Sequence, residues 1–483
     1  MKRIAIIGGG ISGLSAAFEL EKEKSCGAQI DYVLFEASSR FGGAIRTEQV
    51  GDCIVEAGPD SFLTEKPWAA DLCRELGLAD QLIGSNDTAR TTYILVKGRL
   101  LPLPDGMMFM VPTKLISAFL SPLFSWSTKL RMVREWFYRA QHHPAEVSVA
   151  EFVKRHYGRE MVERIADPLL AGVYGGSADE LSVSAVLPRF VDMEAKNGSL
   201  GRAMVAARRK LKAERVSAGQ PKAAEPRLFT SLKNGMQQMI DTLLTRIPAN
   251  NCRLGTRVEA VKPESGKWLV VSEGRTEEFD SVIIALPAYL AAKILAGAEP
   301  AGVELAADLA EIRYSSSVTV VRGYDEAVRA SLPDGFGFLV PRSENKRMLA
   351  ATFVHNKFPH RSPETTALIR CFLGGSRDQD ILDKSEADIE ALVRHELEQV
   401  LGITAQPRFV RTYKWDHAMA QYGISHGARI TRIRQSVSQM PGLALAGNAY
   451  GGIGVPDCVR SGSEAVAKIF KDLQIAQPAI QRV

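Results

Sequence analysis

Cysteine is scarce in this chain of 483 residues. The six copies stand far apart, at positions 26, 53, 73, 252, 371 and 458, and no two of them form a Cys-x-x-Cys pair. The eight histidines form no His-Glu-x-x-His motif either. We therefore predict no metal centre and no disulfide framework. Free thiols suit a reducing compartment, so we expect the protein in the cytoplasm.

A long, uncharged apolar run is also absent, which argues against a membrane-spanning helix. The most apolar stretch, residues 107–126, contains Lys114, Pro112 and Pro122. Its large apolar side chains leave two interpretations open: a wall of a substrate pocket or helical subdomain, or a peripheral contact with a membrane surface. No signal peptide is expected, because an apolar strand begins within the first few residues.

The chain has little net charge, since 60 Lys and Arg residues against 55 Asp and Glu residues give +5. Basic residues gather at 202–222 without aromatic residues between them, so no nucleic-acid partner is expected. We interpret that segment as a solvated helix end followed by a loop. The length and the apolar content of 46% predict two or three domains with a large core.

What the chain does have is a glycine-rich turn between its first strand and its first helix. Gly8, Gly10 and Gly13 form a Gly-x-Gly-x-x-Gly motif, preceded by an apolar strand at 4–7 and followed by an apolar helix face at 14–20. Gly8 would permit the tight turn, Gly10 the approach of a pyrophosphate, and Gly13 close packing of helix on strand. The start of that helix would favour negative charge.

A second strand, at 32–35, ends at Glu36, which lies 23 residues after the last glycine of the motif. A carboxylate near this position binds a ribose hydroxyl in dinucleotide sites and disfavours a 2′-phosphate. Further along, Arg40 can pair with a phosphate, and Gly42 and Gly43 allow close approach of the backbone. Together these residues predict a dinucleotide site.

Strand patterns return later in the chain and indicate that the nucleotide-binding domain is discontinuous. They occur at residues 257–261, 268–272, 281–285 and 442–446. The last of them leads into a second glycine-rich turn at 451–454 and a helix at 463–473. A second strand-turn-helix unit can close over the far end of an extended cofactor, which favours FAD over a nicotinamide.

We predict an α/β fold class with three parts. A Rossmann-like FAD-binding domain comprises residues 1–65, 226–298 and 411–483, and it is interrupted by a mainly helical domain at 66–225 and an α+β substrate domain at 299–410. Helices are expected at 129–141, 151–165 and 385–401. Strands of the substrate domain are expected at 318–321, 336–340, 348–354 and 367–373.

Five further motifs are distinctive: residues 167–176 with Leu181 and Ser182, 229–236, 335–341, Phe358-Pro359 with Arg361, and 452–458. In this order, over nearly the whole chain, they resemble the flavin-dependent amine oxidase superfamily. Within it, they are most similar to the protoporphyrinogen/coproporphyrinogen oxidase family and its soluble bacterial coproporphyrinogen III branch. One position departs from the family, because Ala420 stands before Gln421-Tyr422 where a proline is common. Losing one proline relaxes a turn without removing a reactive group.

The resemblance implies noncovalent FAD as the redox group and does not require a protein side chain as a base. It implies the oxidation of a porphyrinogen to a porphyrin in heme biosynthesis, in three two-electron steps, with oxygen reduced to peroxide. The cofactor-binding residues that it implies are Gly8, Gly9, Gly10, Ile11, Ser12, Gly13, Glu36, Ala37, Arg40, Gly42, Gly43, Ala57, Gly58, Pro59, Asp60, Val258, Trp415, Gly447, Ile453, Gly454 and Val455.

A porphyrinogen is a large apolar ring that carries carboxylates, so its site needs apolar surfaces and basic groups. By the resemblance, Phe336, Gly337 and Leu339 would contact the ring, although a Phe-x-Phe strand is also common in an ordinary core. The candidates for pairing with propionates are Lys66, Arg99 and Arg361.

Coproporphyrinogen III is favoured as substrate, with protoporphyrinogen IX as the alternative. A flavin amine oxidase and a non-enzymatic binding module of the same fold also stay open. Against them, Cys458 does not lie in the usual attachment sequence of a covalent flavin, and Glu36 and Arg40 argue for a retained cofactor. Besides the substrate, the partners expected are molecular oxygen and a downstream enzyme of the heme pathway.

Overall fold

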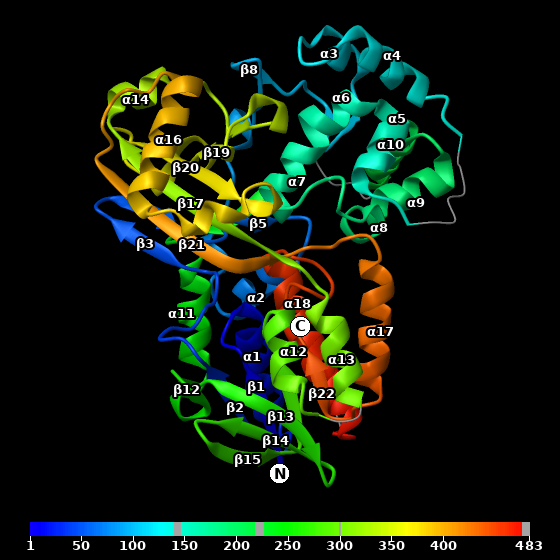
Figure 1. Cartoon of the computed structure of the whole chain (residues 1–483), viewed down its shortest axis with the longest axis vertical. Coiled ribbons are helices and arrows are strands. Elements are labelled where there is room, and N and C mark those ends of the chain that lie inside the picture. Colours follow the sequence, from blue (N-terminus) through cyan, green and yellow to red (C-terminus); the bar gives the residue numbers. More distant parts are fainter. Residues whose placement is uncertain (140–145, 218–226, 299–300, 476–483) are drawn as a thin grey trace. The chain divides into compact units, whose positions relative to one another are not determined.

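The computed structural model of the protein describes residues 1–139, 146–217, 227–298 and 301–475 (Figure 1). The chain forms two compact units. The first unit comprises Met1–Ser85, Leu228–Arg313 and Ala428–Val483, and the second comprises Asn86–Arg227 and Tyr314–Gly427. The division of the second unit into separate helical and α+β domains stays a prediction.

A five-stranded parallel sheet lies at the centre of the first unit, in the order β12-β2-β1-β16-β22. Its strands are β1 (Lys2–Ile7), β2 (Ile30–Glu36), β12 (Cys252–Leu254), β16 (Ser281–Ile284) and β22 (Leu443–Leu445). Ile6 of β1 pairs with Leu34 of β2 on one side and with Ile283 of β16 on the other. Because the strands are parallel, the loops after them leave from one edge of the sheet, where α/β proteins bind ligands.

Four helices cover one face of this sheet: α1 (Ile11–Ser25), α2 (Trp68–Glu75), α11 (Gln237–Arg246) and α18 (Val455–Asp472). Their apolar side chains form a core with alternate strand residues such as Ile4, Ile6 and Leu34. Figure 1 shows α18 running beside α1. The two helices approach closely at Gly462, where a Cβ atom would stand 3.0 Å from the backbone nitrogen of Ala16.

The side chain of Phe35, next to Leu34 on β2, points to the opposite face. There it packs edge-on against Phe279, with 6.1 Å between the ring centres. Phe279 ends an antiparallel sheet made of β13 (Val258–Glu264), β14 (Lys267–Ser272) and β15 (Arg275–Phe279). The other elements of this unit are β3 (Thr47–Val50), β4 (Cys53–Glu56), β5 (Phe62–Leu63), β6 (Leu82–Gly84), β11 (Phe229–Leu232), α12 (Ala288–Leu295), α13 (Ala301–Ala310) and, from Ala428 on, α17 (His426–Ser438).

The second unit contains a seven-stranded sheet in the order β21-β17-β20-β19-β18-β7-β8. Its strands are β7 (Thr92–Val96), β8 (Arg99–Pro102), β17 (Tyr314–Tyr324), β18 (Gly337–Leu339), β19 (Met348–Phe353), β20 (Ala367–Gly374) and β21 (Phe409–Ala420). Helix α16 (Glu386–Leu401) packs on it through Ile389, Val393 and Leu397, which are fully buried. Strands β7 and β8 come from a segment that the sequence predicts as mostly helical.

The helices of the second unit are mostly short. They are α3 (Leu115–Leu120), α4 (Trp126–Glu135), α5 (Val149–Tyr157), α6 (Arg159–Met161), α7 (Asp167–Tyr174), α8 (Val183–Val186), α9 (Pro188–Asn197), α10 (Leu200–Ser217), α14 (Glu326–Ser331) and α15 (Val354–Lys357), with a β9 (Met107–Met108) and β10 (Val111–Pro112) hairpin before them. The prediction of one helix over 151–165 is wrong, because Gly158 takes a φ of +90° and ends α5. The loop predicted after the basic helix α10 falls on 218–226, outside the described residues.

Candidate functional site

Packing requires glycine at two of the three motif positions after β1. Gly8 has a φ of +110°, and a Cβ atom there would collide with the carbonyl oxygen of Ala285. A Cβ atom at Gly13 would collide with the carbonyl oxygen of Gly8, so this glycine lets α1 pack against the turn. At Gly10, by contrast, no protein atom lies within 4 Å of such a Cβ. The chain therefore leaves a cradle in front of Gly10 that a side chain would fill.

The loop after β2 lies directly on this glycine turn. Glu36 accepts a hydrogen bond from the N–H of Gly9 at its Oε2 (2.7 Å). The N–H of Gly42 donates to the carbonyl oxygen of Gly9 (2.8 Å), and a Cβ atom at Gly43 would stand 3.2 Å from Gly10 Cα. A carboxylate thus stands beside the start of α1, at the place where dinucleotide folds carry their ribose-binding acid.

The side chain of Arg40 binds the backbone of the same loop. Its guanidinium donates hydrogen bonds to the carbonyl oxygens of Phe41 (3.1 Å), Ile45 (3.0 Å) and Gly43. Burial lowers the pKa of this arginine below its usual range, with a smaller contribution from the nearby Arg46 charge. Arg40 therefore holds the loop's shape with these N–H groups, a role that the sequence did not indicate.

The second glycine-rich turn is fixed by a buried carboxylate. Gly454 caps the start of α18, and Oδ2 of Asp457 accepts hydrogen bonds from the Gly454 N–H (3.2 Å) and from Lys66 Nζ (2.6 Å). A Cβ atom at Gly452 would collide with the carboxylate of Asp457. Asp457 itself is only 4% exposed. Lys66, a candidate for propionate pairing, thus forms an ion pair with Asp457. Asp457 lies within the motif at 452–458, and the sequence alone indicates no role for it.

These turns place the N-termini of α1 and α18 at the same edge of the parallel sheet. The first N–H groups of a helix have no partner within it and favour an anion. No acidic residue lies in the first turn of α1, and the one in α18, Asp457, is paired with Lys66. The cradle at Gly10, the start of α1 and the carboxylate of Glu36 therefore fit the pyrophosphate and ribose of a dinucleotide.

The other predicted cofactor residues also fall at defined places. Residues 57–60 follow β4, Val258 begins β13 and is 7% exposed, and Gly447 follows β22. With the residues of the two turns, they all belong to the first unit. Trp415 is the exception, since it lies in β21 of the second unit.

The three predicted ring-contact residues lie at or beside β18, in the second unit. A Cβ atom at Gly337 would collide with the carbonyl oxygen of Ala351 and stand 2.8 Å from Thr352 Cα. Close approach of β19 therefore already requires this glycine. Phe336 is 8% exposed, so most of its ring is buried in the protein. Leu339 is half-buried, and its side chain lies 3.7 Å from where a Cβ at Gly172 of α7 would stand.

The two predicted basic candidates of the second unit differ sharply in exposure. Arg99 is exposed at the start of β8, the last strand of its sheet. Arg361 is only 1% exposed, and its guanidinium lies 5.9 Å from the centre of the Phe358 ring. Lys357, which the sequence did not single out, is 8% exposed and lies 5.3 Å from the same ring. Two buried cations therefore lie within about 6 Å of the centre of one phenyl ring, an arrangement that cation–π attraction supports.

The motif at 167–176 is held by an ion-pair hub. Asp167, 5% exposed, pairs with Arg377 (2.5 Å) and Arg342 (3.2 Å). Burial lowers the pKa of the Arg377 guanidinium, and the Asp167 charge opposes that shift. The motif's end is held by Gln421, whose Nε2 donates to the carbonyl oxygen of Tyr174 (2.6 Å). The chain path after Ala420 is therefore fixed by this amide.

Comparison with known proteins decides the family. The model of flavin containing amine oxidoreductases matches residues 11–470. The chain belongs to this family. It is 33% identical to the coproporphyrinogen III oxidase of Bacillus subtilis over 96% of this chain and 97% of that one. It is 29% identical to protoporphyrinogen oxidase 2 of Arabidopsis thaliana, over 98% and 94% of the two chains.

A solved structure agrees with these relatives. A protein from Exiguobacterium sp. 255-15, assigned as a protoporphyrinogen oxidase, is 28% identical and superposes with a TM-score of 0.84 over 98% of this chain and 99% of that one. The resemblance predicted from the motifs is confirmed. This family member is an FAD-dependent oxidoreductase, as predicted, and its fold mixes helices and strands in the manner of FAD-binding relatives.

Two properties of the structure bear on the cofactor and on membranes. Burial raises the pKa of the Cys458 thiol to about 12, so this thiol is neutral and a poor nucleophile at neutral pH. A noncovalent flavin, typical of the family, agrees with that. Across the described ranges, every helix is too short or too polar to span a bilayer.

Proposed function

We propose that this chain oxidises coproporphyrinogen III to coproporphyrin III, with three molecules of oxygen reduced to three of hydrogen peroxide. The macrocycle loses six electrons and six protons, and each oxygen molecule takes up two of each. The observation that carries this proposal is the near full-length relationship to the Bacillus subtilis enzyme, 33% identical over 96% of this chain. The site geometry agrees, because the first unit carries the cradle of a dinucleotide.

The first unit would hold FAD along the carboxyl edge of its parallel sheet. The pyrophosphate would lie at Gly10 and the start of α1, and the ribose at Glu36. The cradle at Gly10, with no protein atom within 4 Å of a Cβ there, supports this placement. The bound flavin supplies two-electron redox chemistry, and the chain supplies position, electrostatics and exclusion of water. The remaining predicted residues, including Val258, would line the rest of the cofactor.

The second unit would bind the tetrapyrrole and its carboxylates. Phe336 and Leu339 supply apolar surface beside β18, and Arg361 and Lys357 are the buried cations of the same unit. A charge-assisted hydrogen bond to a shielded carboxylate contributes about 1.5–3 kcal/mol. Arg361 is thus a stronger candidate for a propionate than the exposed Arg99.

Protoporphyrinogen IX is the second candidate substrate, because the Arabidopsis relative is a protoporphyrinogen oxidase. The two substrates differ at the rim, with four carboxylates on coproporphyrinogen III and two on protoporphyrinogen IX. The deciding experiment measures kcat/KM of the FAD-loaded protein on both, by porphyrin fluorescence. We expect at least a tenfold preference for coproporphyrinogen III. A preference for protoporphyrinogen IX would replace the proposal with the second candidate, and turnover of neither would overturn both.

We also propose that this enzyme contacts a membrane surface through helices α3 and α4. Helix α4 presents Trp126, Leu130 and Val133 on one face, and Phe137 continues the line, with 68%, 63%, 41% and 77% exposure respectively. The spacing of four, three and four residues gives a single helical stripe. From α3, Ile116 and Leu120 add to it, at 79% and 78% exposure. We name these six residues the α3–α4 apolar stripe.

Charge near the stripe favours an anionic surface. Residues 112–139 contain five basic side chains and one acidic side chain, Glu135, which is buried. Lys114, Arg131 and Arg134 are exposed among them. Exposed Trp, Leu and Phe with a basic rim are typical of helices that lie in the headgroup layer. The apolar stretch predicted at 107–126 is thus partly inside the fold, since Met107, Met110 and Phe124 are buried, while the exposed stripe continues beyond it.

A further inference from the structure

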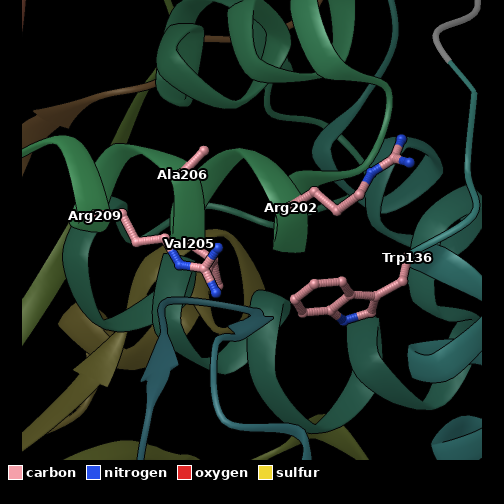
Figure 2. A pocket seen from close by; sticks show the side chains of 5 residues that line it. All are labelled: Trp136, Arg202, Val205, Ala206 and Arg209. Atoms are coloured by element: carbon pink, nitrogen blue, oxygen red, sulfur yellow. The ribbon is translucent and has the colours of Figure 1, made fainter.

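A cavity of 460 Å³ that is open to solvent lies beside the first half of α10 in the second unit (Figure 2). It is lined by Trp136, Arg202, Val205, Ala206 and Arg209. Its volume is in the range of sites for small organic ligands. None of these residues belongs to the cofactor or substrate positions described above.

The four lining residues of α10 form one face of the helix. Counted from Arg202, the other three residues follow after three, four and seven positions, at Val205, Ala206 and Arg209. All four therefore lie on one side of the helix. A rise of about 1.5 Å per residue places the two arginines about 10 Å apart along the helix axis. Between them lie only the apolar side chains of Val205 and Ala206. This face therefore offers two separated cations with an apolar surface in between.

Trp136, which follows α4, supplies the aromatic wall. Figure 2 shows the indole and the guanidinium of Arg209 pointing toward one another, while Arg202 points away from Arg209. The ring is set against Gly201, where a Cβ atom would stand 3.2 Å from the indole nitrogen. This nitrogen is buried and has no acceptor within the part of the chain that the structure describes.

Among the side chains that the structure describes, no acid pairs with either arginine. Nη2 of Arg202 donates to the carbonyl oxygens of Tyr138 (3.1 Å) and Asn197 (2.9 Å), which anchors the side chain without cancelling its charge. Arg209 forms no ion pair with any side chain that the structure describes. The carboxylate of Glu135 is turned inward, where it accepts from the N–H groups of Leu200 (2.6 Å) and Gly201 (3.3 Å). The cavity is consequently positive and partly apolar.

We propose that this cavity binds a planar aromatic polycarboxylate, and that its ligand is the porphyrin product. This inference rests on the proposed function, which supplies such a molecule. A porphyrinogen is puckered because its bridging carbons are saturated, whereas the porphyrin is flat and can stack on an indole. Its propionates project from the ring edge and would meet Arg202 and Arg209. Stacking makes the site selective for product over substrate.

A bare inorganic anion fits the lining less well. The two guanidinium groups would attract phosphate. The apolar groups of Val205, Ala206 and the indole would form no hydrogen bond with that ion, and burying apolar surface against it would gain little free energy. A flat ring between two carboxylates uses all five lining residues. The role of Trp136 therefore distinguishes an aromatic ligand from a simple anion.

The test measures equilibrium binding of coproporphyrin III to the FAD-loaded protein, by titration and by induced circular dichroism of the porphyrin band. The double variant R202Q/R209Q is compared with R159Q/R275Q, which removes two exposed arginines from other places. We expect the first variant to lose one porphyrin per chain, or to bind it at least tenfold more weakly. The control should bind like the wild type. Equal binding by all three proteins would overturn the proposal.

Two further measurements sharpen the result. W136F should keep binding within about threefold, whereas W136A should weaken it at least tenfold, because a phenyl ring still stacks. If phosphate displaces the porphyrin equally from wild type and W136A, the site takes an anion only and the proposal is wrong.

Failure of this site and failure of the proposed function give different results. Arginine-dependent porphyrin binding without turnover of coproporphyrinogen III would support the site and overturn the function. If the chain turns over coproporphyrinogen III, R202Q/R209Q should do so with unchanged kcat and KM, since these residues are outside the proposed catalytic machinery. A large rise in KM in this variant would mean that the arginines bind substrate, which overturns the proposal.

Discussion

Gly462 of α18 lies against Ser12 of α1, so closely that a Cβ atom at position 462 would collide with the Ser12 carbonyl oxygen. Both helices begin at glycine-rich turns of the candidate cofactor site. The contact therefore fixes the separation of the two turns. The backbone packing of α18 on the first turn of α1 therefore sets the width of the candidate site.

We expect G462A to weaken flavin binding and lower stability together. Overpacking of this kind costs about 1–3 kcal/mol, because the helices must move apart. Flavin content after purification and the midpoint of thermal unfolding measure the two effects. G427A is the matched control, since no atom lies within 4 Å of a Cβ on that helical glycine. A G462A protein with wild-type stability and flavin content would show that the helix contact is not tight.

G10V should remove flavin without unfolding the protein. Its Cβ meets no protein atom, but the valine side chain would occupy the cradle proposed for the pyrophosphate. We expect FAD affinity to fall at least tenfold, measured by fluorescence titration of the apoprotein, with thermal stability of the apoprotein unchanged. G13A, which would collide with the Gly8 carbonyl oxygen, should instead impair folding. Full flavin content in G10V would contradict the phosphate placement.

The buried His156 predicts a pH dependence. Its two ring nitrogens lie 3.3 Å from Oε1 of Glu135 and 3.3 Å from Oε1 of Glu194, and Tyr138 and Tyr157 pack near the ring. Burial alone lowers the pKa of His156, but hydrogen bonds and charge from the two carboxylates outweigh it and raise the pKa above 6.5. A neutral imidazole carries one N–H, so only the protonated ring can donate to both carboxylates.

Because the pKa of His156 is higher in the folded than in the unfolded protein, its protonation stabilises the fold. This contribution is complete below the unfolded-state pKa of 6.5, and it is lost as the pH rises through the folded-state pKa. We expect the free energy of unfolding to fall above pH 6.5, by up to about 1.4 kcal/mol per pH unit from this one proton. The measurement is urea unfolding from pH 6 to 9 for wild type and H156Q. The difference between the two curves should shrink with rising pH, and a constant difference would mean that His156 does not titrate in this range.

R361A should raise KM for coproporphyrinogen III by about 10- to 100-fold, as expected for a lost charge-assisted hydrogen bond. Flavin content and kcat should change little if the contact serves binding alone. R361K, which keeps the charge beside Phe358, should recover part of the loss, and R99A is the exposed comparison with an effect below about twofold. Unchanged KM in R361A would remove this residue from the substrate site.

The α3–α4 apolar stripe should bind vesicles that contain anionic lipid. Replacing Leu130 and Phe137 by serine removes two large exposed apolar groups, each contributing about 1.5–3 kcal/mol when buried. We expect L130S/F137S to co-sediment at least tenfold less with phosphatidylglycerol-containing vesicles, with unchanged activity. V303S/I424S, which changes two exposed apolar residues elsewhere, is the control. Equal sedimentation of both variants would show that the stripe is not the contact.

Local patterns predicted the parts of the fold that local physics determines. The first strand, glycine turn, helix and second strand follow one another within 36 residues, and all four form as expected, in β1, α1 and β2. The second turn and the helix α18 after it were predicted for the same reason. The family and its cofactor followed from motifs whose residues are adjacent in sequence.

Interactions between distant segments could not be predicted in this way. The pair of Lys66 and Asp457 joins residues 391 apart, and each residue alone reads as an ordinary surface charge. Strand β7 pairs in parallel with β18, so Tyr93 stands opposite Phe338, and nothing in either short segment specifies that partner. Periodicity places Trp126, Leu130 and Val133 on one face of α4, but it does not say that this face is exposed.

The order in which the chain is synthesised separates the two halves of the cofactor site. The first glycine turn is complete at Gly13, whereas Gly454 of the second turn follows 441 residues later. At ribosomal rates of 5–20 residues per second, that interval lasts about 20–90 s. Until β22 joins β16 and α18 docks on α1, the nascent chain carries its dinucleotide motif on a half-built sheet. Cofactor capture is then a late event, and any chain truncated before residue 443 would display the signature without the site.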